Sequence, residues 1–185
     1  VPYLEEACRP GHDGFSDVIA ALPKLGEAAG RAGLTLLYHN HDFEFVSFSG
    51  MYALDFLYAA MPEDVLKTEI DVCWVKYAGE DPAAYLRKYA GRAPVVHLKD
   101  FVGRKEGDAA PYGLLGQSET KAAGEVPFEF RPVGYGCQDV SAVAEAGLDA
   151  GAKWFVVEQD ASVGRTPLEA AAMSIDTLRK IGLKG

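Results

Sequence analysis

Short apolar runs alternate along the chain with segments whose apolar residues recur at helical spacing. The helical pattern is clearest over residues 15–31, where apolar positions fall three or four residues apart. The helices predicted in this way span residues 15–31, 54–61, 83–90, 139–151 and 167–182. The strands predicted between them span residues 34–38, 66–72, 94–100 and 153–160. Strands that alternate with helices predict an α/β fold with a parallel sheet built from βαβ units.

Proline and glycine positions mark several of the predicted boundaries. Pro82 and Pro167 stand at the start of a predicted helix, where the missing N–H costs little. Pro23 lies inside the first predicted helix and indicates a kink or a break there. Residues 102–132 are polar and rich in glycine, and they are too long for a plain connection. We therefore predict a long active-site loop over residues 102–132.

Polar side chains with metal-binding groups collect at the carboxyl ends of the four predicted strands. In chain order they are His39, Asn40, His41, Asp42 and Glu44, then Glu69 and Asp71, then His97, Lys99 and Asp100, and finally Glu158 and Asp160. In parallel α/β folds the ligand binds outside the carboxyl ends of the strands. Residues two apart on a strand share a face, so several of these side chains are expected to point the same way. The pattern predicts a metal site at this edge of the sheet.

The predicted metal ligands are Asp71, His97 and Glu158, together with either His39 or Glu44. This mixed nitrogen and oxygen set suits Mn²⁺, Mg²⁺, Co²⁺ or Zn²⁺, and the lack of thiolates argues against a structural zinc cage. Simpler interpretations exist for single residues. Asp71 could cap the turn that follows it, and Lys99 could be a solvated charge at the rim. The recurrence of such groups on four strands favours the metal site.

Composition excludes several classes of function. The chain has 185 residues, of which 49% are apolar and 24% are charged, as in an ordinary globular domain. A net charge of −9 argues against a nucleic-acid or anionic-membrane surface. No apolar run approaches the ~20 residues that span a bilayer, and the first residues lack a signal-peptide pattern. Cys8, Cys73 and Cys137 form no CxxC pair, which predicts reduced spectator thiols and a cytoplasmic setting.

Five segments, taken in order, resemble the xylose isomerase-like TIM-barrel family of sugar phosphate isomerases/epimerases. They are GLTLLYHNHDFEF (33–45), EIDVCWVKYAGEDP (69–82), VHLKD (96–100), PVGYGCQDV (132–140) and WFVVEQD (154–160). The family also contains inosose dehydratase-like lyases and is related to endonuclease IV-type enzymes. The resemblance implies a (β/α)8 barrel with one divalent metal ion, Mn²⁺ first among the candidates. It assigns the ligands Asp71, His97 and Glu158.

The chain departs from the family pattern at two positions and in length. Many members have a glutamate ligand where this chain has His39, and in this chain Glu44 is the alternative ligand. Many members also have histidine where this chain has Trp74. Family barrels typically have ~250 residues. Because Val1 to Tyr3 match the end of a fourth strand, residues 1–185 are expected to form one partial barrel domain of about strands 4/5 to 8. Pairing of two such halves in a homo-oligomer is the alternative to a truncated sequence.

The resemblance implies a metal-dependent sugar or polyol isomerase or epimerase that works through an enediolate. Glu158 would bind the metal and act as the base, and Lys99 would stabilise a substrate oxygen, with Glu44 as a further catalytic candidate. His41, Trp74 and Lys99 are the predicted substrate-binding residues. A keto-sugar dehydratase-type lyase and a catalytically incomplete fragment are the alternatives. An endonuclease ranks last because the acidic charge balance suits DNA poorly.

Overall fold

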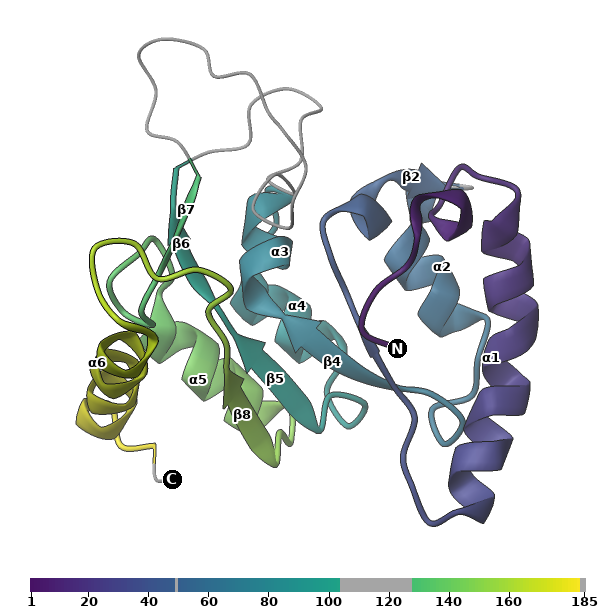
Figure 1. Cartoon of the computed structure of the whole chain (residues 1–185). Helices are drawn as coiled ribbons and strands as arrows, with labels where there is room; N and C mark the ends of the chain where they lie inside the picture. The colour runs from purple at the N-terminus through teal and green to yellow at the C-terminus, as the bar shows by residue number, and fades with distance from the viewer. Residues whose placement is uncertain (49, 104–127, 184–185) are drawn as a thin grey trace, which may run out of the picture.

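Four short strands form a parallel sheet at the centre of the computed structural model, which describes residues 1–48, 50–103 and 128–183 (Figure 1). The strands are β1 (Leu37–His39), β4 (Lys67–Asp71), β5 (Val95–Leu98) and β8 (Trp154–Val157). Their spatial order is β1-β4-β5-β8, and every neighbouring pair is parallel. Each strand overlaps one of the four predicted runs, and β1 begins three residues later than predicted. The predicted parallel sheet is therefore confirmed.

Six α-helices accompany the strands of the described chain. They are α1 (Gly14–Arg31), α2 (Ala53–Ala59), α3 (Val72–Tyr77), α4 (Pro82–Lys88), α5 (Val140–Asp149) and α6 (Pro167–Lys180). All five predicted helices are present, and Pro82 and Pro167 occupy the first helical position as predicted. The predicted break at Pro23 is wrong, because α1 continues through this residue. The additional helix α3 was not predicted, since Val72 was assigned to the preceding strand.

Two antiparallel strand pairs and two short 3-10 helices complete the described elements. The pairs are β2 (Ser47–Phe48) with β3 (Met51–Tyr52), and β6 (Asp100–Val102) with β7 (Glu129–Arg131). The 3-10 helices are η1 (Glu6–Cys8) and η2 (Phe43–Phe45). Both ends of the predicted loop 102–132 therefore belong to strands. Residues 104–127 of that prediction lie outside the described residues.

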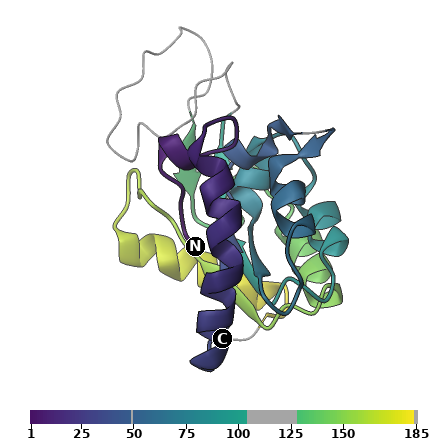
Figure 2. The same cartoon turned by 90° about the vertical axis from the view of Figure 1, so that its right-hand side faces the viewer.

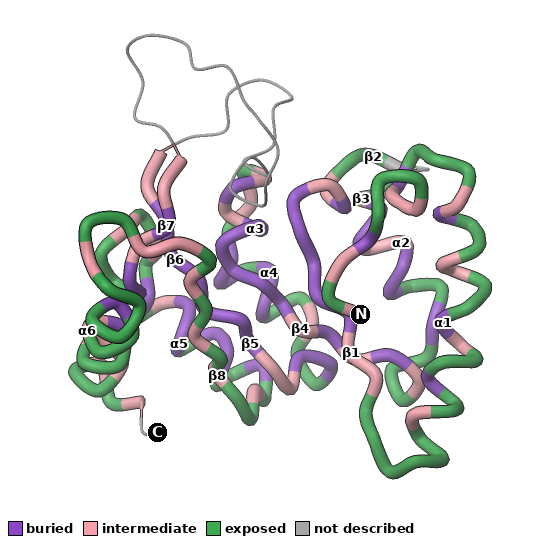
Figure 3. Tube along the Cα trace, viewed as in Figure 1, coloured by how far each residue is buried: buried purple, intermediate pink, exposed green. Residues whose placement is uncertain are grey.

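The apolar core lies between one face of the sheet and the helices. Ile70 of β4 and Val96 and Leu98 of β5 are almost fully buried in it. Figure 1 shows α4 and α5 behind the sheet, and Figure 3 shows buried residues along β5 and on the neighbouring helices, whereas β8 is largely exposed. Figure 2 shows α1 in front of the sheet at the β1 side, opposite α6. Since side chains alternate along a strand, burying these residues turns Asp71 and His97 to the other face.

The two edges of the parallel sheet differ. At one edge, Val1 donates its N–H to Leu37 O at 2.6 Å and accepts a hydrogen bond from His39 N at 3.0 Å, the pattern of a parallel neighbour. At the other edge, no described strand pairs with β8 beyond β5. The side chain of Trp154 is 68% exposed there, and Val156 is 42% exposed. No helix of the described chain is long and apolar enough to cross a membrane.

Candidate metal centre

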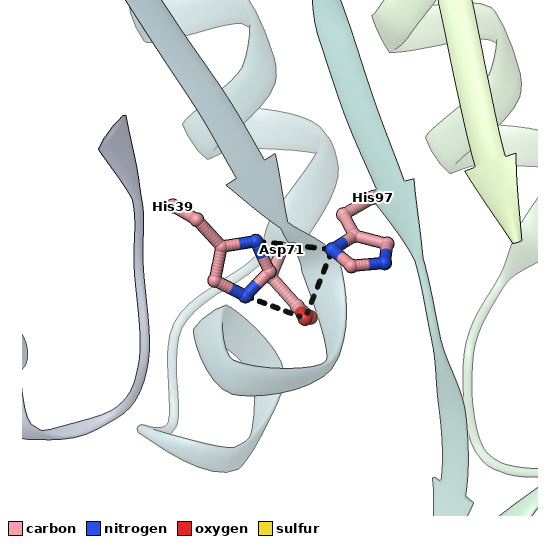
Figure 4. A group of neighbouring side chains, drawn as sticks. All are labelled: His39, Asp71 and His97. Carbon is pink, nitrogen blue, oxygen red and sulfur yellow. Dashed lines mark hydrogen bonds and ion pairs between the residues drawn. The ribbon is translucent and has the colours of Figure 1, made fainter. Parts of the chain in front are cut away.

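His39, Asp71 and His97 meet where three parallel strands end (Figure 4). His39 Nδ1 lies 3.0 Å from His97 Nδ1, and His39 Nε2 lies 3.4 Å from Asp71 Oδ2. His97 Nδ1 lies 3.8 Å from the same carboxylate oxygen. All three side chains are buried. The register explains the meeting, because Asp71 of β4 stands directly opposite His97 of β5.

The two carboxylate oxygens of Asp71 have different surroundings. Oδ1 accepts hydrogen bonds from the backbone N–H groups of Cys73 at 2.8 Å and Trp74 at 3.3 Å, which caps α3. Oδ2 is buried and accepts no hydrogen bond from the described residues. A buried carboxylate oxygen without a donor is costly unless a cation faces it, and here Lys99 Nζ lies 3.7 Å from Oδ2. Asp71 therefore performs the predicted capping role and still leaves one oxygen turned toward the histidines.

Glu158 extends the cluster toward solvent, whereas its partner Lys99 is buried, so the simpler interpretation of Lys99 as a solvated rim charge is wrong. Glu158 Oε2 lies 3.1 Å from His97 Nε2 and 2.6 Å from Lys99 Nζ. Lys99 Nζ also lies 3.0 Å from Asp160 Oδ2. The hydrogen bond with His97, aided by Lys99, outweighs burial and holds the pKa of Glu158 far below its usual value. Glu158 is thus an ionised carboxylate at neutral pH.

Contacts with carboxylates oppose the effect of burial on the pKa of Lys99 and of His97. Burial would lower the pKa of Lys99, but the carboxylates of Asp71, Glu158 and Asp160 outweigh it and raise the pKa. Burial opposes charge on His97 in the same way, and its contacts with Glu158 and Asp71 raise its pKa. The cluster therefore carries a permanent ammonium group beside its carboxylates. This ammonium group is available to stabilise a negatively charged substrate oxygen.

Glu44 lies apart from this cluster. The Tyr38 hydroxyl donates to Glu44 Oε1 at 2.6 Å, and the His41 backbone N–H donates to Oε2 at 2.8 Å. The side chain is completely buried, and burial raises its pKa to about 8. The structure thus brings His39, and not Glu44, next to Asp71 and His97. Of the two residues predicted as alternative ligands, His39 therefore has the geometry that suits a shared ion.

A cavity of about 500 Å³ opens beside the cluster. Its lining includes Glu69 and Glu158 together with the aromatic side chains of Tyr3, His41 and Trp74. Trp74 is buried and stacks on Phe128 at a centroid distance of 6.0 Å, which fixes the orientation of its ring. His41 stacks on Phe43, and burial lowers its pKa to about 2, so its ring is neutral. Apolar ring faces beside charged groups suit a polyhydroxylated ligand.

Asp100 joins the end of β5 to the loop that precedes α5. Its carboxylate accepts hydrogen bonds from the N–H groups of Phe101, Gly134, Gly136 and Gln138 at 2.8–3.1 Å. A Cβ atom on Gly136 would lie 2.2 Å from Asp100 Oδ1, so only glycine allows this approach. Gln138 in turn donates to Val72 O at 2.8 Å. Asp100 therefore supports the site through the backbone rather than lining the cavity.

The donor set fits a divalent metal ion. Imidazole nitrogens and carboxylate oxygens are ligands of Mn²⁺, Co²⁺ and Zn²⁺, and Asp71 Oδ2 is a buried acceptor without a donor. The thiols do not contribute to the cluster, since Cys8, Cys73 and Cys137 are all free and none belongs to it. His39, Asp71 and His97 are thus a possible metal site.

Residues 3–181 match the sequence profile of the xylose isomerase-like TIM barrel. The chain belongs to this family. The predicted fold class is confirmed, and the four parallel strands are part of such a barrel. No curated protein matches the chain.

Solved structures of similar fold include sugar isomerase and epimerase proteins. A sugar phosphate isomerase/epimerase from Parabacteroides distasonis aligns with a TM-score of 0.67 and 21% identity, covering 97% of this chain and 55% of that one. A xylose isomerase domain protein from Planctomyces limnophilus aligns with a TM-score of 0.62 and 17% identity, covering 97% and 55%. An L-ribulose 3-epimerase aligns with a TM-score of 0.60 and 17% identity, covering 97% and 56%. The chain thus spans about half the length of these structures, and at these identities the likeness shows the fold.

Sequence reasoning on this xylose isomerase-like chain assigned no role to three residues that shape the cluster. Asn40 accepts from Asp71 N at 2.9 Å and donates to Asp71 O at 3.3 Å, which ties β1 to the end of β4. Asp160 pairs with Lys99, and Glu69 faces both histidines. Contact with His39 lowers the pKa of Glu69. In the sequence, these residues could be recognised only by their position at the ends of the strands. What each one contacts depends on which strands are neighbours in the sheet.

Proposed function

We propose that the chain carries the site of a metal-dependent sugar or polyol isomerase or epimerase. The observation that supports this most is the buried cluster of His39, Asp71 and His97, which lies beside the ionised Glu158 and the cavity. Membership of the family supplies the reaction class, since similar folds include sugar phosphate isomerases/epimerases. The sugar substrate is part of the proposal.

His39, Asp71, His97 and Glu158 would hold the ion. When bound, a divalent ion supplies Lewis acidity to adjacent carbonyl and hydroxyl oxygens, which makes the intervening C–H more acidic. Mn²⁺ is the ion we propose first, with Mg²⁺, Co²⁺ and Zn²⁺ as alternatives. The lack of any thiol in the cluster agrees with this choice of harder metals.

The chain's own residues would perform the proton transfer. Glu158 is ionised and partly exposed to the cavity, so it can accept a proton from the carbon beside the substrate carbonyl. Returning that proton to the former carbonyl carbon, while the hydroxyl proton moves to the former carbonyl oxygen, gives an isomer. An epimer results when water in the cavity instead delivers a proton to the opposite face of the first carbon and Glu158 gives up its proton to solvent. Lys99 Nζ would donate hydrogen bonds to the oxygen that becomes negatively charged. The ring of Trp74 would pack against the apolar face of the sugar.

The first experiment measures the metal content of the purified chain by mass spectrometry for the wild type, His97→Ala and His12→Ala. His12 is exposed and lies outside the cluster, so its variant is the matched control. We expect near-stoichiometric metal in the wild type and in His12→Ala, and loss of metal in His97→Ala. A metal-free wild type that takes up no added Mn²⁺ would contradict the proposal.

The second experiment incubates the chain with ketoses and polyols in the presence of Mn²⁺ and follows the products by NMR. A product of unchanged mass that disappears with chelator supports isomerisation or epimerisation. A product that has lost water supports the lyase alternative, because both reactions share the first proton abstraction. Conversion that is insensitive to chelator would refute the metal-dependent mechanism.

A further inference from the structure

Glu69 is a carboxylate at the cluster to which the proposed reaction gives no role. It stands two residues before Asp71 on β4, so both side chains project from the same face of the strand. Glu69 pairs in register with His39 of β1 and lines the cavity. Its side chain is one-quarter exposed, which leaves it room to move within the site.

The distances around Glu69 are those of atoms that share a metal ion. Glu69 Oε1 lies 3.7 Å from His97 Nδ1 and 3.9 Å from His39 Nδ1, and the two nitrogens are 3.0 Å apart. Ligands at ~2.1 Å from one ion are separated by about 3.0 Å at a right angle and about 3.6 Å at 120°. The three separations fall within about 0.3 Å of these values. One ion at ordinary bond lengths therefore fits between these three atoms.

Glu69 and Asp71 face the same nitrogen of His97, Nδ1, but opposite nitrogens of His39. Asp71 Oδ2 lies 3.4 Å from His39 Nε2 and 3.8 Å from His97 Nδ1, without a hydrogen bond. The contacts of Glu69 at 3.7 and 3.9 Å are also too long for direct hydrogen bonds. At His97 Nδ1 both carboxylates thus lie at a distance that a shared cation would bridge, and Glu69 alone also lies at such a distance from His39 Nδ1. A carboxylate that only oriented a ring would be expected within hydrogen-bond distance of its N–H.

We propose that Glu69 is an additional ligand of the metal centre, so that β4 supplies two carboxylates to one ion. This inference rests on the metal site of the proposed function. With Glu69, Asp71 and Glu158 the centre has three carboxylates for its two imidazoles. Such an oxygen-rich set reduces the usual advantage in affinity of Zn²⁺ over Mn²⁺, because carboxylates suit the harder ion and allow more than four ligands. Glu69 would therefore contribute to the choice of metal.

The test compares Glu69→Gln with Glu63→Gln, an identical change at an exposed residue of the preceding turn. Mn²⁺ affinity is measured by titration calorimetry on the full chain, and the visible absorption of bound Co²⁺ reports the coordination number. We expect Glu69→Gln to weaken Mn²⁺ binding more than 100-fold and to change the Co²⁺ spectrum. That loss exceeds the roughly 10–100-fold cost of losing an outer hydrogen-bond partner. Glu63→Gln should match the wild type in both measurements.

Two results would overturn the inference. One is unchanged Mn²⁺ affinity in Glu69→Gln. The other is a smaller loss with the wild-type Co²⁺ spectrum, which would make Glu69 an outer partner of the histidines. A wild-type chain that binds neither ion would instead refute the metal site itself, so the two failures are distinguishable. Circular dichroism of the metal-free variants confirms that each one is folded before titration.

Discussion

Replacing Glu44 by glutamine tests the separation between this buried carboxyl and the metal cluster. Glu44 is fully buried, where the Tyr38 hydroxyl and the His41 backbone N–H both donate to it. Burial raises its pKa from 4.5 to about 8, so the neutral acid is the form that suits the folded state at pH 7. Glutamine has a similar shape and is always neutral. The substitution therefore removes the ionisation. The amide oxygen can accept from the His41 N–H, and the Tyr38 hydroxyl must turn so that its oxygen accepts from the amide N–H, a cost that is the same at every pH.

The size of the effect follows from the two pKa values. Below pH 4.5 the carboxyl of Glu44 is protonated in both the folded and the unfolded chain, so this group adds no pH dependence to the free energy of unfolding. Between pH 4.5 and 8 the unfolded chain loses the proton while the folded chain keeps it, so stability falls as the pH rises. Above pH 8 the full cost is reached. At about 1.4 kcal/mol per pKa unit this cost is about 5 kcal/mol.

The assay is urea unfolding of wild type, Glu44→Gln and Glu63→Gln at several pH values between 5 and 8.5, with chelator present. The variant's unfolding free energy should gain about 4 kcal/mol relative to the wild type across this range. Glu63→Gln should run parallel to the wild type, because Glu63 is exposed. Parallel curves for Glu44→Gln would refute the reasoning. In a separate Mn²⁺ titration without chelator, loss of binding in Glu44→Gln would contradict the placement of Glu44 outside the metal site.

Three other substitutions test charges and an exposed edge of the sheet. Lys99→Met removes the cation 2.6 Å from Glu158, so the acidic limb of the pH–rate profile should move to higher pH. Asp100→Asn places an amide where four backbone N–H groups converge, and urea titration should show a loss of about 2–3 kcal/mol. Trp154→Lys removes a 68% exposed indole from edge strand β8 and should reduce concentration-dependent association in sedimentation velocity. An unchanged profile, stability or sedimentation coefficient would contradict the respective argument.

The alternation of strands and helices could be predicted because the core imposes it on the sequence. Strands such as β4 and β5 bury one face against helices, and this requires apolar residues such as Ile70 and Val96 at alternate positions. Proline at the first helical position predicted the starts of α4 and α6, because the first N–H of a helix has no partner within the helix and its loss costs little. Local signals of this kind are present in the sequence before any tertiary contact is known.

The elements that were not predicted depend on contacts between distant residues. Helix α3 has only six residues, Val72–Tyr77, and all except Lys76 are apolar or aromatic. A run of this length is too short to show helical spacing and resembles a strand. Strands β6 and β7 pair across residues that are far apart in sequence, Asp100 with Arg131 for example. Whether His39 or Glu44 lies next to Asp71 and His97 also depends on contacts that the sequence does not show. The short turn η2 directs Glu44 back to Tyr38 and away from the cluster.

Asp71 connects the fold to the candidate chemistry. The carboxylate that ends β4 begins α3 by capping it through Oδ1, and the same geometry leaves Oδ2 among the histidines. Asn40 holds the Asp71 backbone from the neighbouring strand, so the position of Oδ2 depends on the pairing of β1 with β4. A ligand placed by a helix cap and a strand pairing has little freedom to move. This restriction on Asp71 favours a preformed metal site over one assembled only when the ion arrives.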